Sequence, residues 1–199
     1  TLGPDGHVHL LALGFDGFAQ QAGSVSSIVV SRSVDGGVTW GATTALIRDS
    51  DAVFNDKGAI VADPLDAHFV YAVWDRLTAV NTGPAMFARS IDGGLSWQAP
   101  KAIYDPGVNH QTIDNIIGVL PNGTLVNMFT QIDPGPNGSL AVSVAVVRST
   151  DNGVTWSLPI KIADQLTVGT RDPDGGAPVR DRSIVPDMVL GPGASLVVV

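Results

Sequence analysis

The sequence predicts an all-β fold made of repeated, four-stranded antiparallel units, and three observations support this prediction. First, residues that favour helices are scarce, because the chain has no Glu and only three Lys among its 199 residues. Second, short apolar runs rich in Val and Thr alternate with Gly, Pro and Asn clusters, as strands and turns require. Third, one nine-residue phrase occurs three times, at 32–40, 89–97 and 148–156.

The spacing of this phrase indicates how the units are arranged. It is written RSVDGGVTW, then RSIDGGLSW, then RSTDNGVTW, and its Asp residues are 57 and then 59 residues apart. A period of this length that holds several short strands is typical of a β-propeller or a β-array. The three phrases and the less complete ends predict about three to three and a half four-stranded blades in one partial propeller domain, 1–199.

The middle unit shows the pattern of strands best. Blade B (58–104) is predicted to contain strands at 58–64, 68–76, 85–90 and 96–104, with the repeated phrase forming the hairpin between the last two. A chain that alternates short apolar runs with turns in this way forms antiparallel hairpins.

The other units repeat this pattern to different extents. Blade C (113–164) is predicted to have strands at 116–121, 124–132, 140–149 and 155–163, and the Asn-Gly pair between the first two is a strong hairpin signal. Blade A (1–47) lacks most of its first strand, and the start of blade D (183–199) has two strands. Exposed edge strands promote aggregation, so we expect further blades of a parent chain, or a second copy, to cover the open edges.

The repeated phrase has a structural explanation. Its Asp can accept hydrogen bonds from backbone N–H groups of its own turn, and the glycines supply the positive φ that the hairpin needs. Ser or Thr can tie the turn to the strand, and Trp covers the edge of the blade. We therefore assign a structural role to the following residues of the phrases: Ser33, Asp35, Gly37, Trp40, Ser90, Asp92, Gly94, Trp97, Ser149, Asp151, Gly153 and Trp156.

Composition excludes several classes of partner and site. The net charge of −8 disfavours binding to nucleic acid or to an anionic membrane. The chain has no Cys, so it has neither a disulfide framework nor a thiolate metal site. No apolar run approaches the ~18 residues of a membrane span. We predict no cofactor and no metal.

The phrase carries a resemblance to a known family. The pattern S-x-D-x-G-x-[ST]-W is the Asp-box, or bacterial neuraminidase repeat, so the chain resembles the sialidase-type β-propellers. Members commonly have six blades of four strands, with Asp-boxes between the third and fourth strands, away from the active site. The stretches FNDKGAIVADP and RSIVPDMVL also look like segments of secreted bacterial sialidase-like proteins. The resemblance therefore implies a secreted or periplasmic location.

The resemblance also implies which face carries chemistry. Strand alternation puts the Asp-box hairpins and the turns between first and second strands on one face. The other connections share the opposite face, where family members carry their catalytic groups. Its segments here are 48–57, 75–84, 105–114, 133–139 and 164–183, and they hold most of the charged residues outside the Asp-boxes. A rim that is merely solvated remains the alternative.

A complete sialidase apparatus is missing from the sequence. The resemblance implies three arginines around a substrate carboxylate, an Asp acid/base, and a Tyr nucleophile activated by Glu. The chain has no Glu, and its two tyrosines, Tyr71 and Tyr104, lie in strands where packing explains them. Either other blades supply the missing groups, or the protein has diverged to another role.

Position on the expected functional face selects the candidate residues. Asp56, just before a first strand, is the candidate general acid. The candidate substrate-binding residues, for an anionic or hydroxyl-rich sugar, are Arg48, Lys57, Asp75, Arg76, Arg180, Arg182 and Asp187. An ion pair between Asp56 and Lys57 that closes the blade is the structural alternative. His110 is a candidate hydrogen-bond donor of a loop.

Two functions remain open at this stage. The first is a sialidase-like glycoside hydrolase that removes terminal sugars from glycans once other blades complete its site. The second is a non-catalytic Asp-box propeller that binds glycan or protein. We expect a glycan or another carbohydrate as the ligand.

Overall fold

The fold is all-β, as the sequence predicts. The structure is a computed structural model that describes residues 1–78, 82–166, 171–176, 179, 185–191 and 195–198. These residues contain thirteen strands and one short 3-10 helix, η1 (Pro136–Gly138). Within them, no helix has the length and apolar character needed to cross a membrane.

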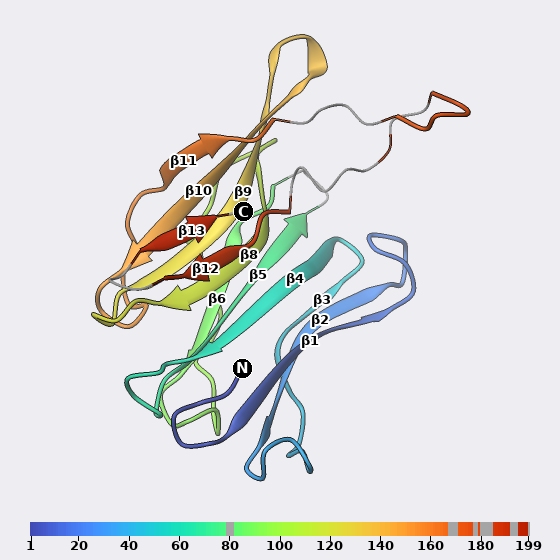
Figure 1. Cartoon of the computed structure of the whole chain (residues 1–199). Coiled ribbons are helices and arrows are strands. Elements are labelled where there is room, and N and C mark those ends of the chain that lie inside the picture. The colour runs from blue at the N-terminus through green and yellow to red at the C-terminus, as the bar shows by residue number, and fades with distance from the viewer. Residues whose placement is uncertain (79–81, 167–170, 177–178, 180–184, 192–194, 199) are drawn as a thin grey trace.

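The strands form successive antiparallel sheets in chain order (Figure 1). The first sheet holds β1 (Val8–Asp16), β2 (Val25–Ser33) and β3 (Thr44–Ser50). The second holds β4 (Val53–Ala62), β5 (Val70–Thr78), β6 (Ala85–Ser90) and β7 (Lys101–Tyr104). The third holds β8 (Gln111–Val119), β9 (Leu125–Pro134), β10 (Leu140–Ser149) and β11 (Ile160–Asp164). The last pair is β12 (Met188–Leu190) and β13 (Leu196–Val198).

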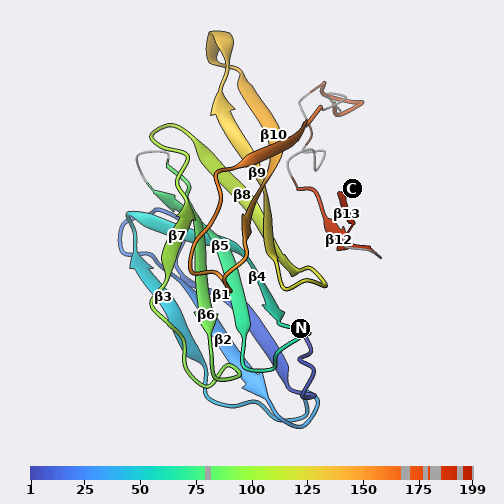
Figure 2. The same cartoon turned by 90° about the vertical axis from the view of Figure 1, so that its left-hand side faces the viewer.

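The sheets pack face to face, and the core lies between them (Figures 1 and 2). Ile28 of the first sheet packs with Trp74 of the second, both fully buried. Phe87 of the second sheet packs with Ile117 of the third, and Met128 of the third packs with Met188 of the last pair. Burying apolar side chains on both faces of a sheet is what stacks blades side by side.

First strands lie next to one another along this stack. β4 contacts β1 and β2 on one side and β8 on the other, whereas the fourth strands β7 and β11 lie at the opposite edge of their sheets. The first strands therefore form the inner side of the assembly, which is where a propeller places its central axis.

The observed strands differ from the predicted ones at both ends of the blade. β4 begins at Val53 instead of 58, and β8 at Gln111 instead of 116, because each strand continues through a β-bulge that breaks the alternation of apolar residues. The stretch 48–57, predicted as rim, is therefore mostly strand. β7 and β11 are shorter than predicted because Pro100 and Pro159 precede them and have no N–H for the ladder.

The Asp-box hairpins have the predicted internal bonding. In the first, the Ser33 hydroxyl donates to Asp35 Oδ1 at 2.7 Å, and Thr39 donates to both oxygens of the same carboxylate. The other two hairpins repeat these bonds with the same geometry. The third copy uses Asn152, at φ 54°, where the others have Gly, since Asn tolerates the left-handed region.

The Asp-box tryptophans pack against the preceding sheet. Trp156 meets the Phe87 ring edge-on at 5.2 Å, and Trp97 packs on the core between the first two sheets. Trp40 belongs to the first described sheet and is 43% exposed. The Trp therefore covers a junction between blades.

Candidate functional site

The two ends of the strands are separated as expected. The Asp-box hairpin follows the end of β6 at Ser90, which pairs with Val70 at the start of β5. Five residues further along β5, Asp75 pairs with Asp56 of β4, at the end away from the hairpin. The Gly93 N–H donates to His68 O at 2.8 Å, which fixes the turn between first and second strands beside the Asp-box. Asp56 and Asp75 therefore lie at the other end of the blade.

Two bulges shape this end of the first strands. The register of β4 shifts between Asp56 and Ala59, and that of β8 shifts between Ile113 and Ile116. Lys57 and Asp114 occupy the bulges with φ of 41° and 62°, a conformation uncommon for residues other than Gly. The two side chains approach each other across the blade junction, with Lys57 Nζ 3.9 Å from Asp114 Oδ1. Bulges are common beside active sites because they redirect a side chain.

Asp75 is the buried support of this arrangement. Its side chain is fully buried and accepts hydrogen bonds from the Asp114 N–H at 2.9 Å and from the backbone and side-chain N–H groups of Asn115. Burial raises the pKa of Asp75 to about 8, against the lowering effect of these donors. Because it has no exposed surface, Asp75 positions the bulge of the next blade and does not itself contact a ligand.

Asp114 is the carboxylate that this support presents. Its Oδ2 atom is buried and has no hydrogen-bond partner, while its side chain keeps 14% exposure. Burial raises the pKa of Asp114, Lys57 opposes this, and the charges of Asp187 and Asp56 raise it further. A carboxyl that gains a proton more readily than usual and keeps some exposed surface is suited to donate that proton.

We call these residues the rim cluster: Asp56, Lys57, Asp75, Asp114 and Asp187. Within it, the Asp56 carboxylate accepts from the Lys57 N–H at 2.8 Å, and Asp187 is exposed and accepts from the Met188 N–H at 2.7 Å. The sequence had suggested that Asp56 and Lys57 lie just before a first strand, but both lie inside β4. Lys57 pairs with Asp114 of the next blade, so the predicted side-chain pair of Asp56 with Lys57 is not the contact observed.

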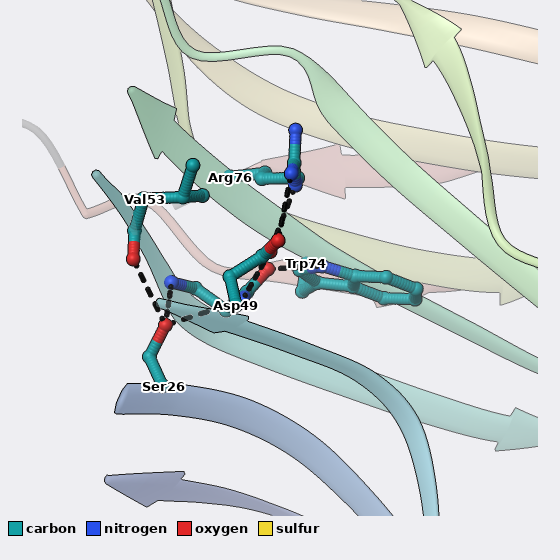
Figure 3. Close-up of polar contacts among 6 residues, drawn as sticks. Ser26, Asp49, Val53, Trp74 and Arg76 are labelled. Carbon is teal, nitrogen blue, oxygen red and sulfur yellow. Dashed lines mark hydrogen bonds and ion pairs between the residues drawn. The ribbon is translucent and has the colours of Figure 1, made fainter. Parts of the chain in front are cut away.

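A second polar network holds β4 against its neighbours (Figure 3). Asn55 is fully buried and donates to Ser26 Oγ at 3.2 Å and to Asp49 Oδ2 at 3.0 Å, while it accepts from Trp74 Nε1 at 3.0 Å. Arg76 makes a bidentate pair with the same Asp49 carboxylate, at 2.8 and 3.0 Å. Hydrogen bonding from Arg76 lowers the pKa of Asp49. The network joins four strands from two blades next to the rim cluster.

The predicted arginines do not join the rim cluster in the described residues. Arg76 is committed to Asp49, and only about a quarter of its side chain is exposed. Arg48 is exposed on β3 next to Asp49, so strand alternation directs it to the other face of the sheet. Arg180 and Arg182 lie outside the described residues. Of the predicted residues, Asp56, Lys57, Asp75 and Asp187 are brought together.

Both tyrosines are packing residues, in agreement with the sequence. Tyr71 is fully buried, donates to Asp63 Oδ2 at 3.1 Å, and has its pKa raised by burial. Tyr104 stacks on Phe129 and donates to Gln131 Oε1 at 3.1 Å. Neither is in a position to act as an activated nucleophile. His110 contacts Asp133 Oδ1 at 2.7 Å, which is a structural contact between rim segments.

Asp114 is the functional candidate that the sequence left out of the site. A signal for it exists, because Asp114 stands seven residues before Pro121 just as Lys57 stands seven residues before Pro64. Aligning the two first strands on these prolines would have shown that Lys57 and Asp114 occupy equivalent positions, each in the bulge of its own strand. Among the described residues, no group of three His or Asp side chains is arranged to hold a metal ion.

The fold and the hairpins define the class of fold: the described residues form part of a β-propeller whose blades close with Asp-box hairpins. The BNR/Asp-box repeat family matches residues 147–158, the third phrase. No curated protein matches the chain significantly.

Solved structures share the fold at low sequence identity. An α-L-arabinanase of Penicillium chrysogenum complexed with arabinobiose aligns with a TM-score of 0.67 and 13% identity, over 98% of this chain and 53% of that one. An α-L-arabinofuranosidase of Fusarium graminearum in complex with an iminosugar inhibitor aligns with a TM-score of 0.64 and 16% identity, over 96% of this chain and 53% of that one. A protein of unknown function from Dyadobacter fermentans aligns with a TM-score of 0.54 and 16% identity, over 81% of this chain and 40% of that one. The chain spans about half the length of the first two.

Proposed function

We propose that this chain forms part of a glycoside hydrolase propeller that releases terminal sugars from glycans at the rim cluster. The observation that carries the proposal is Asp114, which has a raised pKa and a side chain that is still 14% exposed, lies 3.9 Å from Lys57 and feels the charge of a second carboxylate, Asp56. Most glycosidases need such a pair, one carboxyl protonated and one ionised. The carbohydrate-bound structures with the same fold support a sugar as ligand.

The roles follow from the surroundings of each carboxyl. Asp114 would protonate the departing sugar oxygen, because burial and its acidic neighbours favour its protonated form. Asp56 would act as the second carboxyl of the pair, as nucleophile or base. Lys57 would hold hydroxyl groups or a negative charge of the substrate, and Asp75 would position the bulge that carries Asp114.

Substrate class and location are further parts of the proposal. Two glycosidases of this fold are named for arabinose-containing substrates, which makes α-L-arabinofuranosides the first class to test, ahead of sialosides. The missing Glu, the buried Tyr71 and the packing of Tyr104 on Phe129 disfavour sialoside chemistry in this part of the protein. We also propose that further blades of a longer polypeptide, or a second copy, complete the ring, and that the protein is secreted.

The test is hydrolysis of a panel of aryl glycosides by the longest natural polypeptide that contains this chain. Asp114→Asn should lower kcat by about a hundredfold or more, since a positioned general acid contributes at least that much. Asp66→Asn, an exposed carboxylate in a turn at the hairpin end, is the matched control and should keep full activity. A wild type that binds oligosaccharides but cleaves none of the panel would refute the hydrolase and support the binding propeller instead.

A further inference from the structure

A cavity lies at the Asp-box end of the first two sheets, away from the rim cluster. It has a volume of about 450 Å³ and lies between the outer strands of the first sheet and the Asp-box hairpin of the second. The residues that line it include Trp40, Trp97, Val30, Leu95 and Arg32. This size is within the range of ligand sites in proteins.

The next junction provides an internal comparison. The same place between the second and third sheets has a smaller cavity, of about 250 Å³. Positions 57 residues apart correspond, so Val30 aligns with Phe87 and Thr44 with Lys101. The Phe87 ring packs against Trp156, and Lys101 extends over that ring to donate to Val154 O at 2.6 Å. The smaller residues Val30 and Thr44 of the first sheet therefore leave a space open, whereas Phe87 and Lys101 fill the corresponding space at the second sheet.

The arginines of the phrase differ in the same way. Arg89 is satisfied, because its Nε donates to Gln98 Oε1 at 2.8 Å and its Nη1 donates to Asn152 O. Gly41 stands at the position that corresponds to Gln98, and the Nε of Arg32 is buried without a hydrogen-bond partner. A buried donor left unpaired is costly, so the Arg32 side chain lacks the local stabilisation that Gln98 gives to Arg89.

Arg32 also lacks an acidic partner in the described part of the chain. Its Nη2 contacts His7 Nδ1 at 2.6 Å, and the same His7 Nδ1 contacts Asp5 Oδ2 at 2.5 Å, so the nearest carboxylate reaches Arg32 only through His7. His9 lines the cavity as well, and burial together with Arg32 lowers the pKa of His9 to about 4, so that this imidazole is neutral at pH 7. The cavity therefore combines a single cationic fork with two indole surfaces and the hydroxyls of Ser31 and Thr44.

We propose that this cavity is a carbohydrate-binding site for a hexuronic acid residue, separate from the rim cluster. Guanidinium pairs with a carboxylate through two parallel, charge-assisted hydrogen bonds. Indole rings offer a flat apolar surface for the C–H face of a sugar ring, and the hydroxyls suit its polar edge. A neutral sugar would leave the Arg32 donor unsatisfied, so the site should discriminate against it.

Binding is measured by calorimetry on the full natural polypeptide, with galacturonate and glucuronate against galactose and glucose. The acids should bind at least about tenfold more tightly than the neutral sugars, and binding should change the Trp fluorescence, since two indoles line the site. Arg32→Gln should reduce affinity for the acids at least about tenfold. Equal affinity for acid and neutral sugar, or no binding of either, would overturn the proposal.

Three further variants test whether the sugar acid occupies this cavity and no other part of the protein. Val30→Phe, which copies the residue of the next blade, should abolish binding by filling the cavity. Arg148→Gln removes the same charge at the same place in the third phrase, where the side chain is exposed, and should bind as wild type does. Asp114→Asn should also leave this binding unchanged, and a loss there would assign the sugar to the rim cluster and refute a separate site. Circular dichroism and melting temperature confirm that each variant is folded.

Discussion

Replacing Asn55 by Leu should destabilise the protein strongly although the two side chains have similar size. Asn55 is fully buried and its amide makes three side-chain hydrogen bonds, to Ser26, Asp49 and Trp74 (Figure 3). Leu can make none of them. The variant therefore tests whether polar bonding, and not volume, holds the junction of the first two blades.

The magnitude follows from what each partner loses. Trp74 is fully buried, and its Nε1–H has no other partner in the described structure, so orphaning it costs about 1–3 kcal/mol. Asp49 keeps its bidentate Arg76, and Ser26 keeps the Val53 carbonyl, so each loses about 1 kcal/mol or less. The total loss is about 1–5 kcal/mol, which corresponds to a decrease in Tm of about 2–20 °C for a chain of this length.

Urea denaturation followed by circular dichroism measures this loss, provided the m-value is unchanged. Trp74→Phe removes the N–H that Asn55→Leu leaves unpaired, so the double variant should be more stable than the sum of the single effects by about 1–2 kcal/mol. A loss below about 0.5 kcal/mol, or strictly additive single variants, would show that the amide contributes little and that the network is incidental.

Two predictions concern the pH dependence of stability. Because burial raises the pKa of Asp75 to about 8, the folded protein retains a proton that the unfolded chain has released, and stability should fall between pH 4 and pH 8 by up to about 1.4 kcal/mol per pH unit. Asp75→Asn should flatten this slope in urea titrations, and an unchanged slope would contradict the assignment. Conversely, hydrogen bonds from Ser96 lower the pKa of Asp92 to about 2, so the wild type should lose stability as pH falls from about 4 to 2. Asp92→Asn should lack that acid-induced loss in circular dichroism, and sensitivity equal to wild type would argue against it.

The hairpin end could be predicted from the sequence because its interactions are local. The bonds between Ser33 and Asp35, and between Asp35 and Thr39, span two and four residues, so the nine-residue phrase contains all their partners. Turn chemistry and the period near 57 residues were then sufficient to fix four-stranded units and the face that carries the hairpins.

The rim could be predicted only in part because its partners come from different blades. Asp75 bonds to a backbone 39 and 40 residues further along the chain, and no local pattern shows this. The bulges also moved Asp56 and Lys57 from an expected loop into β4, since one extra residue in a strand disrupts the period of two. Arg76 was expected to bind the ligand because of its position near the rim. The sequence does not show that its charge is paired with Asp49 instead.

Comparing the repeats with one another separates structural residues from functional ones more clearly than the hairpin phrase or the rim residues do alone. Every blade must close its hairpin, so the Ser and Asp of the phrase recur with the same bond lengths. The Ser of each phrase pairs with the first residue of the second strand, and the position five residues further along that strand lies at the rim. This position holds a different residue in each blade, Leu13, Asp75 and Thr130, because each blade meets its neighbours differently there. A single asymmetric ligand can be recognised only by groups that differ from blade to blade. The departures from the repeat, Asp114 against Lys57 at the rim and Gly41 against Gln98 at the hairpin end, are therefore where ligand chemistry should be sought.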